Sequence, residues 1–164
     1  MKHLQSNLTH LANTLDIPTS FEISNDALWA SIEDTNALEE FAKGLQTMHA
    51  RVCMITCARV DEGHDILYHF DIKGVLFNLK LHLKTPLLPS ITPLFESANW
   101  AERELSELYG ITLENHPNPA KLFIDESIKE AIYEAYVPLS SAMNGEVSRH
   151  LWEKVKMAQG ENNG

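Results

Sequence analysis

The chain has 164 residues, of which 44% are hydrophobic and 22% are charged, and these values are typical of one soluble globular domain with its own core. Its net charge of −10 excludes the basic surface that binding to nucleic acids or anionic membranes requires. Two cysteines form no disulfide framework, and no apolar segment predicts a membrane-spanning helix or a signal peptide, so we expect a cytoplasmic protein without direct membrane insertion.

The N-terminal third predicts two helices with a strand between them. Leucines recur at helical spacing over residues 3–15, and a second apolar stripe runs from Leu38 to Met48. Residues 27–32, with the sequence ALWASI, predict the short strand. Helices and strand alternate here, which favours a mixed fold.

The period of the apolar residues then changes from 3.6 to 2. Residues 51–60 are apolar at nearly every position, which predicts a strand that is covered on both faces. A hairpin turn is expected at 61–64, and residues 66–72 and 77–83 alternate between apolar and polar. We therefore predict an antiparallel meander with one packed face and one wetter face.

Residues 93–123 contain the best-marked helix, with Thr92 as its expected cap, Pro93 at its first position and Gly110 as its stop. Its apolar stripe comprises Ala98, Ala101, Leu105, Leu108 and Tyr109. Four polar residues outside that stripe are expected on a charged face: Asn99, Glu102, Arg103 and Glu107. Trp100 lies between the two faces, so it is either a core residue or an aromatic anchor for a partner.

The C-terminal part begins with a non-helical turn at 116–119 (HPNP), and residues 122–124 are expected to form a short strand or to pack. Asp125 predicts the start of a helix that ends at Pro138, and a last helix is expected over 147–158. The overall prediction is an α+β fold, with an antiparallel sheet of three to four strands packed by helices and a C-terminal helical extension. Residues 1–138 form the single domain, and residues 139–164 form a helix and a polar tail.

The candidate metal ligands are His49, Cys53 and Cys57, which stand four residues apart. On a helix they would share one face, but the residues around them favour a strand, where the two cysteines share a buried face and His49 lies outside it. Zinc also prefers four ligands at closer paired spacing. We therefore predict no metal site.

Catalytic motifs are also missing from the sequence. It contains no glycine-rich phosphate loop, no nucleophile elbow and no paired CxxC motifs. Glu102 and Glu104 point about 200° apart on a helix, which does not suit a catalytic carboxylate pair. We predict no catalytic residue and no cofactor, and a hydrolase that uses Glu104 and His116 is the enzymatic alternative.

Residues 90–118 resemble the signature region of the peripheral-arm C-subunit family of the respiratory-chain NADH-quinone oxidoreductase, which includes related subunits of energy-converting nickel-iron hydrogenases and formate hydrogenlyase. The matching residues are Ala98, Asn99, Trp100, Glu102, Arg103, Glu104, Glu107, Leu108, Tyr109, Gly110, Ile111, His116 and Pro117. So many fixed spacings form a far more specific signal than a single short motif. The resemblance covers roughly residues 25–124 and implies the α+β fold of that family.

The resemblance implies a non-catalytic subunit, peripheral to the inner membrane, that docks on a hydrogenase-like large subunit beside an iron–sulfur small subunit. Catalysis then takes place in these partners. The residues expected at or supporting the partner interface are Asn99, Trp100, Glu102, Arg103, Glu104, Glu107, Tyr109, His116 and Lys121. Residues 96–134 hold nine acidic against three basic side chains, which favours a basic patch on the partner.

Two departures from the family pattern qualify this interpretation. Ala120 and Lys121 follow the His-Pro turn where the family usually has an arginine, and residues 136–140 replace a common Pro-Leu-Arg-Lys-Asp stretch. Both departures favour the hydrogenase or formate hydrogenlyase type over the NADH-linked enzyme. They also motivate an alternative, in which the chain is a free-standing protein-binding or assembly module that retains the fold without the complex.

Overall fold

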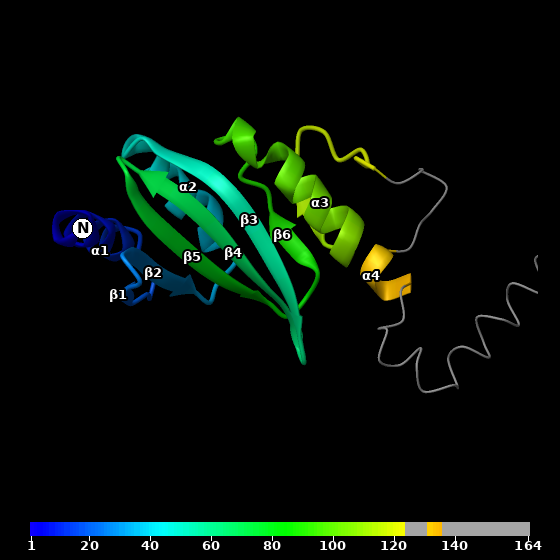
Figure 1. Cartoon of the computed structure of the whole chain (residues 1–164), viewed down its shortest axis with the longest axis horizontal. Helices are drawn as coiled ribbons and strands as arrows, with labels where there is room; N and C mark the ends of the chain where they lie inside the picture. The colour runs from blue at the N-terminus through cyan, green and yellow to red at the C-terminus, as the bar shows by residue number, and fades with distance from the viewer. Residues whose placement is uncertain (124–130, 136–164) are drawn as a thin grey trace, which may run out of the picture.

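The computed structural model describes residues 1–123 and 131–135, which form an α+β fold (Figure 1). The elements in chain order are α1 (Lys2–Thr14), β1 (Phe21–Ser24), β2 (Ala27–Ile32), α2 (Ala37–Thr47), β3 (Ala50–Val60), β4 (Gly63–Ile72), β5 (Val75–Leu83), β6 (Leu87–Pro89), the 3-10 turn η1 (Glu96–Ala98), α3 (Asn99–Tyr109), β7 (Thr112–Glu114) and α4 (Ile132–Ala135). The predicted helix over 147–158, the boundary at 138, the segment 136–140 and most of the helix from Asp125 lie outside the described residues.

The main sheet has five strands in the order β1-β2-β5-β4-β3, and the predicted antiparallel meander forms β3, β4 and β5. Two features were not predicted. β1 pairs with β2 through a hairpin whose turn residues, Asn25 and Asp26, both have positive φ, as such turns require. β2 and β5 are parallel, with Leu28 opposite Phe77, because the chain between them contains α2 and the β3–β4 hairpin.

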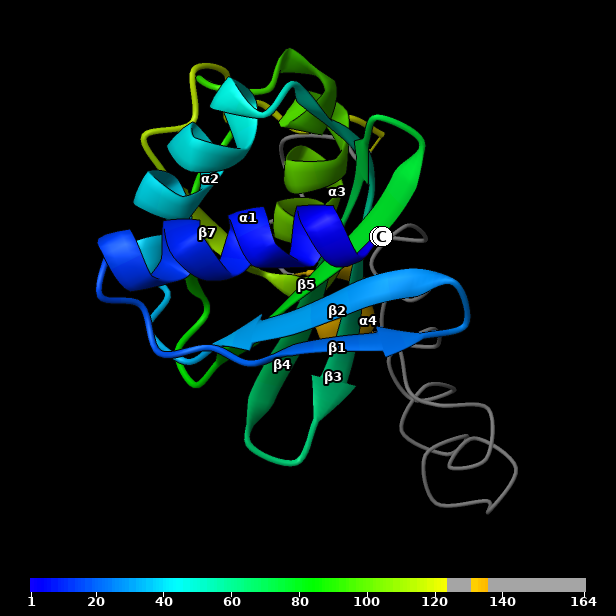
Figure 2. The ribbon, with the colours of Figure 1, turned by 90° about the vertical axis from the view of Figure 1, so that its left-hand side faces the viewer.

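The core lies between the sheet and the helices α1, α2 and α3 (Figure 2). The buried face of the sheet contributes a row of aromatic rings, in which Tyr68 stacks on Phe70 and Phe70 on Phe77. Gly44 in α2 lets α1 approach closely, since a Cβ at this position would overlap the Leu11 side chain. The same core also includes residues of α3 and of the second sheet, which consists of β6 and β7.

The prediction that residues 51–60 are covered on both faces is wrong, because five residues of the edge strand β3 are exposed and only Val52 and Ile55 are buried. Its pairing with β4 shifts between Val52 and Met54, so Cys53 is exposed rather than buried with Cys57. Cys57 is half-buried, and this burial, with a smaller effect of the Asp65 charge, raises the pKa of its thiol to about 11. Within residues 1–123 and 131–135, no three metal-ligating side chains come together.

The predicted start of the signature helix is also wrong. α3 begins at Asn99, after the 3-10 turn η1, and neither Thr92 nor Pro93 lies in a helix. Ser97, in the 3-10 turn, donates its hydroxyl to the Val52 carbonyl of β3. Gly110 ends the helix in the left-handed conformation at φ 69°, as predicted. No helix of the described part is long and apolar enough to cross a membrane.

Candidate functional site

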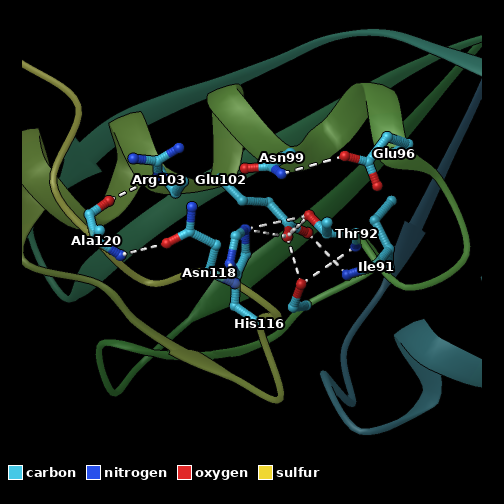
Figure 3. A network of polar contacts seen from close by, with 10 residues as sticks. Ile91, Thr92, Glu96, Asn99, Glu102, Arg103, His116, Asn118 and Ala120 are labelled. Atoms are coloured by element: carbon cyan, nitrogen blue, oxygen red, sulfur yellow. Dashed lines mark hydrogen bonds and ion pairs between the residues drawn. The ribbon is translucent and has the colours of Figure 1, made fainter.

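The Glu102 carboxylate lies on the buried side of α3, with no exposed surface. It accepts three hydrogen bonds from the segment that leads into the helix (Figure 3): 2.5 Å from Ser90 Oγ, 2.8 Å from the Ile91 N–H and 2.7 Å from Thr92 Oγ1. Such donors stabilise a buried carboxylate in place of water. The prediction that Glu102 lies on a charged outer face of α3 is therefore wrong. Its carboxylate instead binds the segment after β6 and holds that segment against the helix.

His116 completes this network from the other side. Its Nδ1 accepts the Asn118 N–H at 3.0 Å, so the ring carries its proton on Nε2 and is neutral. The Thr92 hydroxyl donates to Glu102 and thus accepts from His116 Nε2 at 3.2 Å (Figure 3). The 3.7 Å between His116 Nε2 and Glu102 Oε2 is therefore a packing contact between a neutral ring and a carboxylate. Both ring nitrogens are occupied in holding the turn at 116–118.

Arg103 and Glu107 hold residues 120–123, which we call the strap, against α3. The Arg103 guanidinium donates from Nε to the Ala120 carbonyl at 2.6 Å and from Nη2 to the Lys121 carbonyl at 2.9 Å. The Glu107 carboxylate accepts the Leu122 and Phe123 N–H groups, each at 3.0 Å. Glu107 is buried by this arrangement, which corrects its expected place on a charged outer face.

The outward side of α3 has few exposed residues. Trp100 is 66% exposed, which excludes a core position for this residue. Glu104, one turn later, is exposed as well. Asn99 is half-buried and donates to Glu96 at 3.4 Å, and Tyr109 donates its hydroxyl to the Cys57 carbonyl of β3 at 2.8 Å. Of the nine expected interface residues, Trp100 and Glu104 are the ones that the structure leaves most open to a partner.

The structure does not support the hydrolase alternative. Glu104 is exposed on α3, whereas His116 is buried behind the helix with both nitrogens bonded. A cavity of about 690 Å³ lies elsewhere, and its lining includes Asp65, Lys80 and His82. These three side chains already bond one another, at 2.6 Å for Lys80 and 2.9 Å for His82 to Asp65. The region around α3 is built to hold backbone segments together and to display an aromatic side chain.

The comparison with known proteins gives the family of this α+β domain. Residues 28–147 match the family described as respiratory-chain NADH dehydrogenase, 30 Kd subunit. That match covers more than half of the chain, so the chain belongs to this family, and the predicted relation to the C-subunit family of NADH-quinone oxidoreductase is confirmed.

Individual relatives agree with the family. The C subunit of the NADH-quinone oxidoreductase of Methylobacterium radiotolerans is 28% identical over 118 residues, which cover 66% of this chain and 54% of the relative. The J subunit of the NAD(P)H-quinone oxidoreductase of Synechococcus sp. (strain CC9605) is 51% identical over 45 residues, which cover 27% of this chain and 24% of the relative. The chain therefore spans between about a quarter and about half of the length of these relatives.

Two solved structures share the fold. A trypsin-resistant fragment of Nqo5 has a TM-score of 0.54 at 23% identity, and the match covers 69% of this chain and 97% of that one. A chain of a membrane-bound sulfane sulfur reductase, described as an archaeal respiratory membrane complex, has a TM-score of 0.60 at 13% identity, with 74% of this chain and 77% of that one covered. At these identities the likeness shows the fold alone.

Sequence reasoning missed the partners of the buried carboxylates. Ser90 and Thr92 belong to a proline-rich connection without a recognisable motif, and the strap acts through its backbone atoms. The burial of Glu102 had a signal, however: it stands four residues after Ala98 and three before Leu105, which are both buried. Because Glu102 is charged, it was left out of the apolar stripe of the helix, although its spacing places it there.

Proposed function

We propose that this chain is a non-catalytic peripheral subunit of a membrane-bound, ion-translocating oxidoreductase, which docks and stabilises a hydrogenase-like large subunit. The observation that carries the proposal is Trp100, which is 66% exposed on the helix that otherwise holds the signature region together. A large, rigid aromatic side chain on an open surface is characteristic of interface anchors. On this proposal the electron-transfer chemistry takes place in the partners, and the chain lies on the cytoplasmic side of the inner membrane.

The charge around Trp100 supports the choice of partner surface. Glu96 and Glu104 are exposed on either side of Trp100 in the sequence, whereas the Arg103 guanidinium is bonded to the strap. An acidic rim around an apolar anchor complements a partner pocket that is bordered by Lys or Arg. We expect the large subunit to present such a pocket, with the iron–sulfur small subunit bound in the same complex.

The finer assignment to the hydrogenase or formate hydrogenlyase type rests on the sequence departures at 120–121 and 136–140. The alternative of a free-standing module drew on Ala120, where the family usually has an arginine, and on Ser140, which lies outside the described residues. Position 120 is held here by its carbonyl, which every residue type provides, so the strap keeps its contact with Arg103 without an arginine side chain at position 120. We therefore favour a chain that still assembles with its complex.

The test is purification of the tagged chain from gently solubilised membranes of its host, with mass spectrometry of the proteins that accompany it. We expect a hydrogenase-like large subunit and an iron–sulfur small subunit with the wild type, and loss of both with Trp100→Ala. Ile23→Ala is the matched control, because Ile23 is 47% exposed on β1, at the opposite edge of the sheet from β3. Recovery of the wild-type chain alone contradicts the proposal.

A further inference from the structure

Phe123 has the most exposed large apolar side chain of the described residues, at 73%. Its backbone is nevertheless held firmly, since backbone groups of the strap make five hydrogen bonds to Arg103 and Glu107 with lengths between 2.6 and 3.3 Å. Bonds to a charged group are the stronger kind of protein hydrogen bond. The structure thus fastens the backbone of this residue and leaves its ring in solvent.

The strap lies over the same face of α3 that carries Trp100. Glu107 follows Trp100 by seven residues, which is nearly two helical turns, so the two positions point in almost the same direction about 10 Å apart along the axis. Arg103 lies between them, three residues after Trp100. The Glu107 carboxylate binds the Phe123 N–H, so Phe123 extends the surface that begins at Trp100.

An exposed phenyl ring gains nothing from this position in the isolated chain, because an apolar group stabilises a protein only when it leaves water. In an interface the same position is favourable. Aromatic anchors supply much of the binding energy, and a backbone that is already ordered lowers the entropy lost on binding. Burial of the Phe123 ring by a partner therefore explains both why its backbone is held in place and why its ring is exposed in the isolated chain.

We propose that Phe123 is a second anchor of the docking surface, and that Arg103 and Glu107 are positioning residues that hold it in register with Trp100. This inference rests on the proposed function. The matching occupant is a protein surface with two apolar pockets, one for Trp100 and one for Phe123 beside the Glu107 end of α3. Basic side chains border these pockets, opposite the exposed Glu96 and Glu104.

The experiment uses membranes of a host strain that lacks this chain, to which the purified full-length chain is added back. The bound fraction is measured by co-sedimentation, and the half-saturating concentration is compared between variants. We expect Phe123→Ala and Trp100→Ala each to raise this concentration at least about tenfold, as aromatic interface anchors do. Ile23→Ala is expected to leave it within about twofold, since isolated exposed positions outside an interface contribute little.

The outcomes separate the two proposals. If Trp100→Ala weakens binding and Phe123→Ala behaves like Ile23→Ala, the second anchor is overturned and the docking surface of the proposed function stands. If neither variant weakens binding, or if the wild-type chain does not bind the membranes, the proposed function fails and the second anchor fails with it.

A double-mutant cycle tests the positioning role. Glu107→Ala is expected to weaken binding about tenfold in the wild-type background and less than about threefold when Phe123 is already Ala, because the strap then has no ring to position. Thermal unfolding of each variant confirms that it is folded under the binding conditions. Equal weakening in both backgrounds shows a merely structural role for Glu107 and overturns its assignment as a positioning residue.

Discussion

The two sides of α3 differ sharply in what their polar residues do. On the inner side, Glu102 is buried and accepts three hydrogen bonds, with a neutral His116 beside it. On the outer side, Glu104 and Trp100 are exposed, as is Phe123 in the strap. Glu102 and Glu104 stand two residues apart in one signature, yet the first organises the fold and the second faces solvent.

This difference shows which part of the signature is available for recognition. Glu102, Glu107 and His116 are buried and bind backbone or hydroxyl groups of the chain itself. Arg103 donates to two carbonyls of the strap. The charged residues therefore assemble the surface, and the aromatic residues are the ones presented on it. A motif that looks like a charged interface in the sequence is largely an internal scaffold in the structure.

The largest effect is expected at Glu102. Glu102→Ala removes the acceptor for three donors, which are then buried without partners, and it should lower the free energy of unfolding by about 3–5 kcal/mol. Glu104→Ala is the matched control and should change it by less than about 0.5 kcal/mol. Urea unfolding followed by far-UV circular dichroism measures both. Similar losses for the two variants contradict the distinction between the sides of α3.

A smaller effect is expected where the strap is held. Glu107→Ala removes the acceptor of the Leu122 and Phe123 N–H groups and should cost about 1–3 kcal/mol. Hydrogen exchange of these two amides should become faster, while the amide of Ile91, which is bonded to Glu102, keeps its protection. Unchanged exchange at Leu122 and Phe123 shows that Glu107 does not fasten the strap in solution.

Features that depend on local pattern could be predicted from the sequence. The meander of β3, β4 and β5 follows from alternation, and the end of α3 follows from Gly110. Which face a strand exposes depends on its neighbours, which alternation does not specify. The segment 51–60 was expected to be buried on both faces because of its apolar composition, although five residues of β3 are exposed.

The candidate site could be located in the sequence, but the hydrogen-bond partners of its residues could not be predicted. The signature picked out α3 and Trp100, whose environment the sequence left open and the structure resolves as exposed. The donors to Glu102 come from a segment ten to twelve residues earlier, and those to Glu107 from one fifteen to sixteen residues later. Such contacts depend on how β6, α3 and the strap pack together. Helical spacing alone places Glu102 among buried residues, so the charge of a side chain was a poorer guide than its position.

The smallest effect on stability is expected at Asp65, whose carboxylate pairs with charged or polar side chains near the surface, unlike the buried Glu102. Asp65 bonds Lys80 and His82 at the surface of the sheet, and these two partners, Lys80 foremost, hold the pKa of Asp65 below its usual value. Pairs of this sort contribute roughly 0.2–1 kcal/mol, because water and salt screen them. Asp65→Asn should therefore cost at most about 1 kcal/mol at pH 7, well below the loss expected for Glu102→Ala.

The pH dependence of that loss separates its electrostatic origin from packing. A carboxylate whose pKa is lowered by folding stabilises the native state above its unfolded pKa of about 3.9, and this contribution disappears as the pH falls through the lower, folded value. The difference between wild type and Asp65→Asn in urea unfolding should thus be constant from pH 7 to 5 and shrink below about pH 4. A difference that persists in acid attributes the effect to the shape of the side chain, because a protonated Asp65 carries no charge for Lys80 to stabilise.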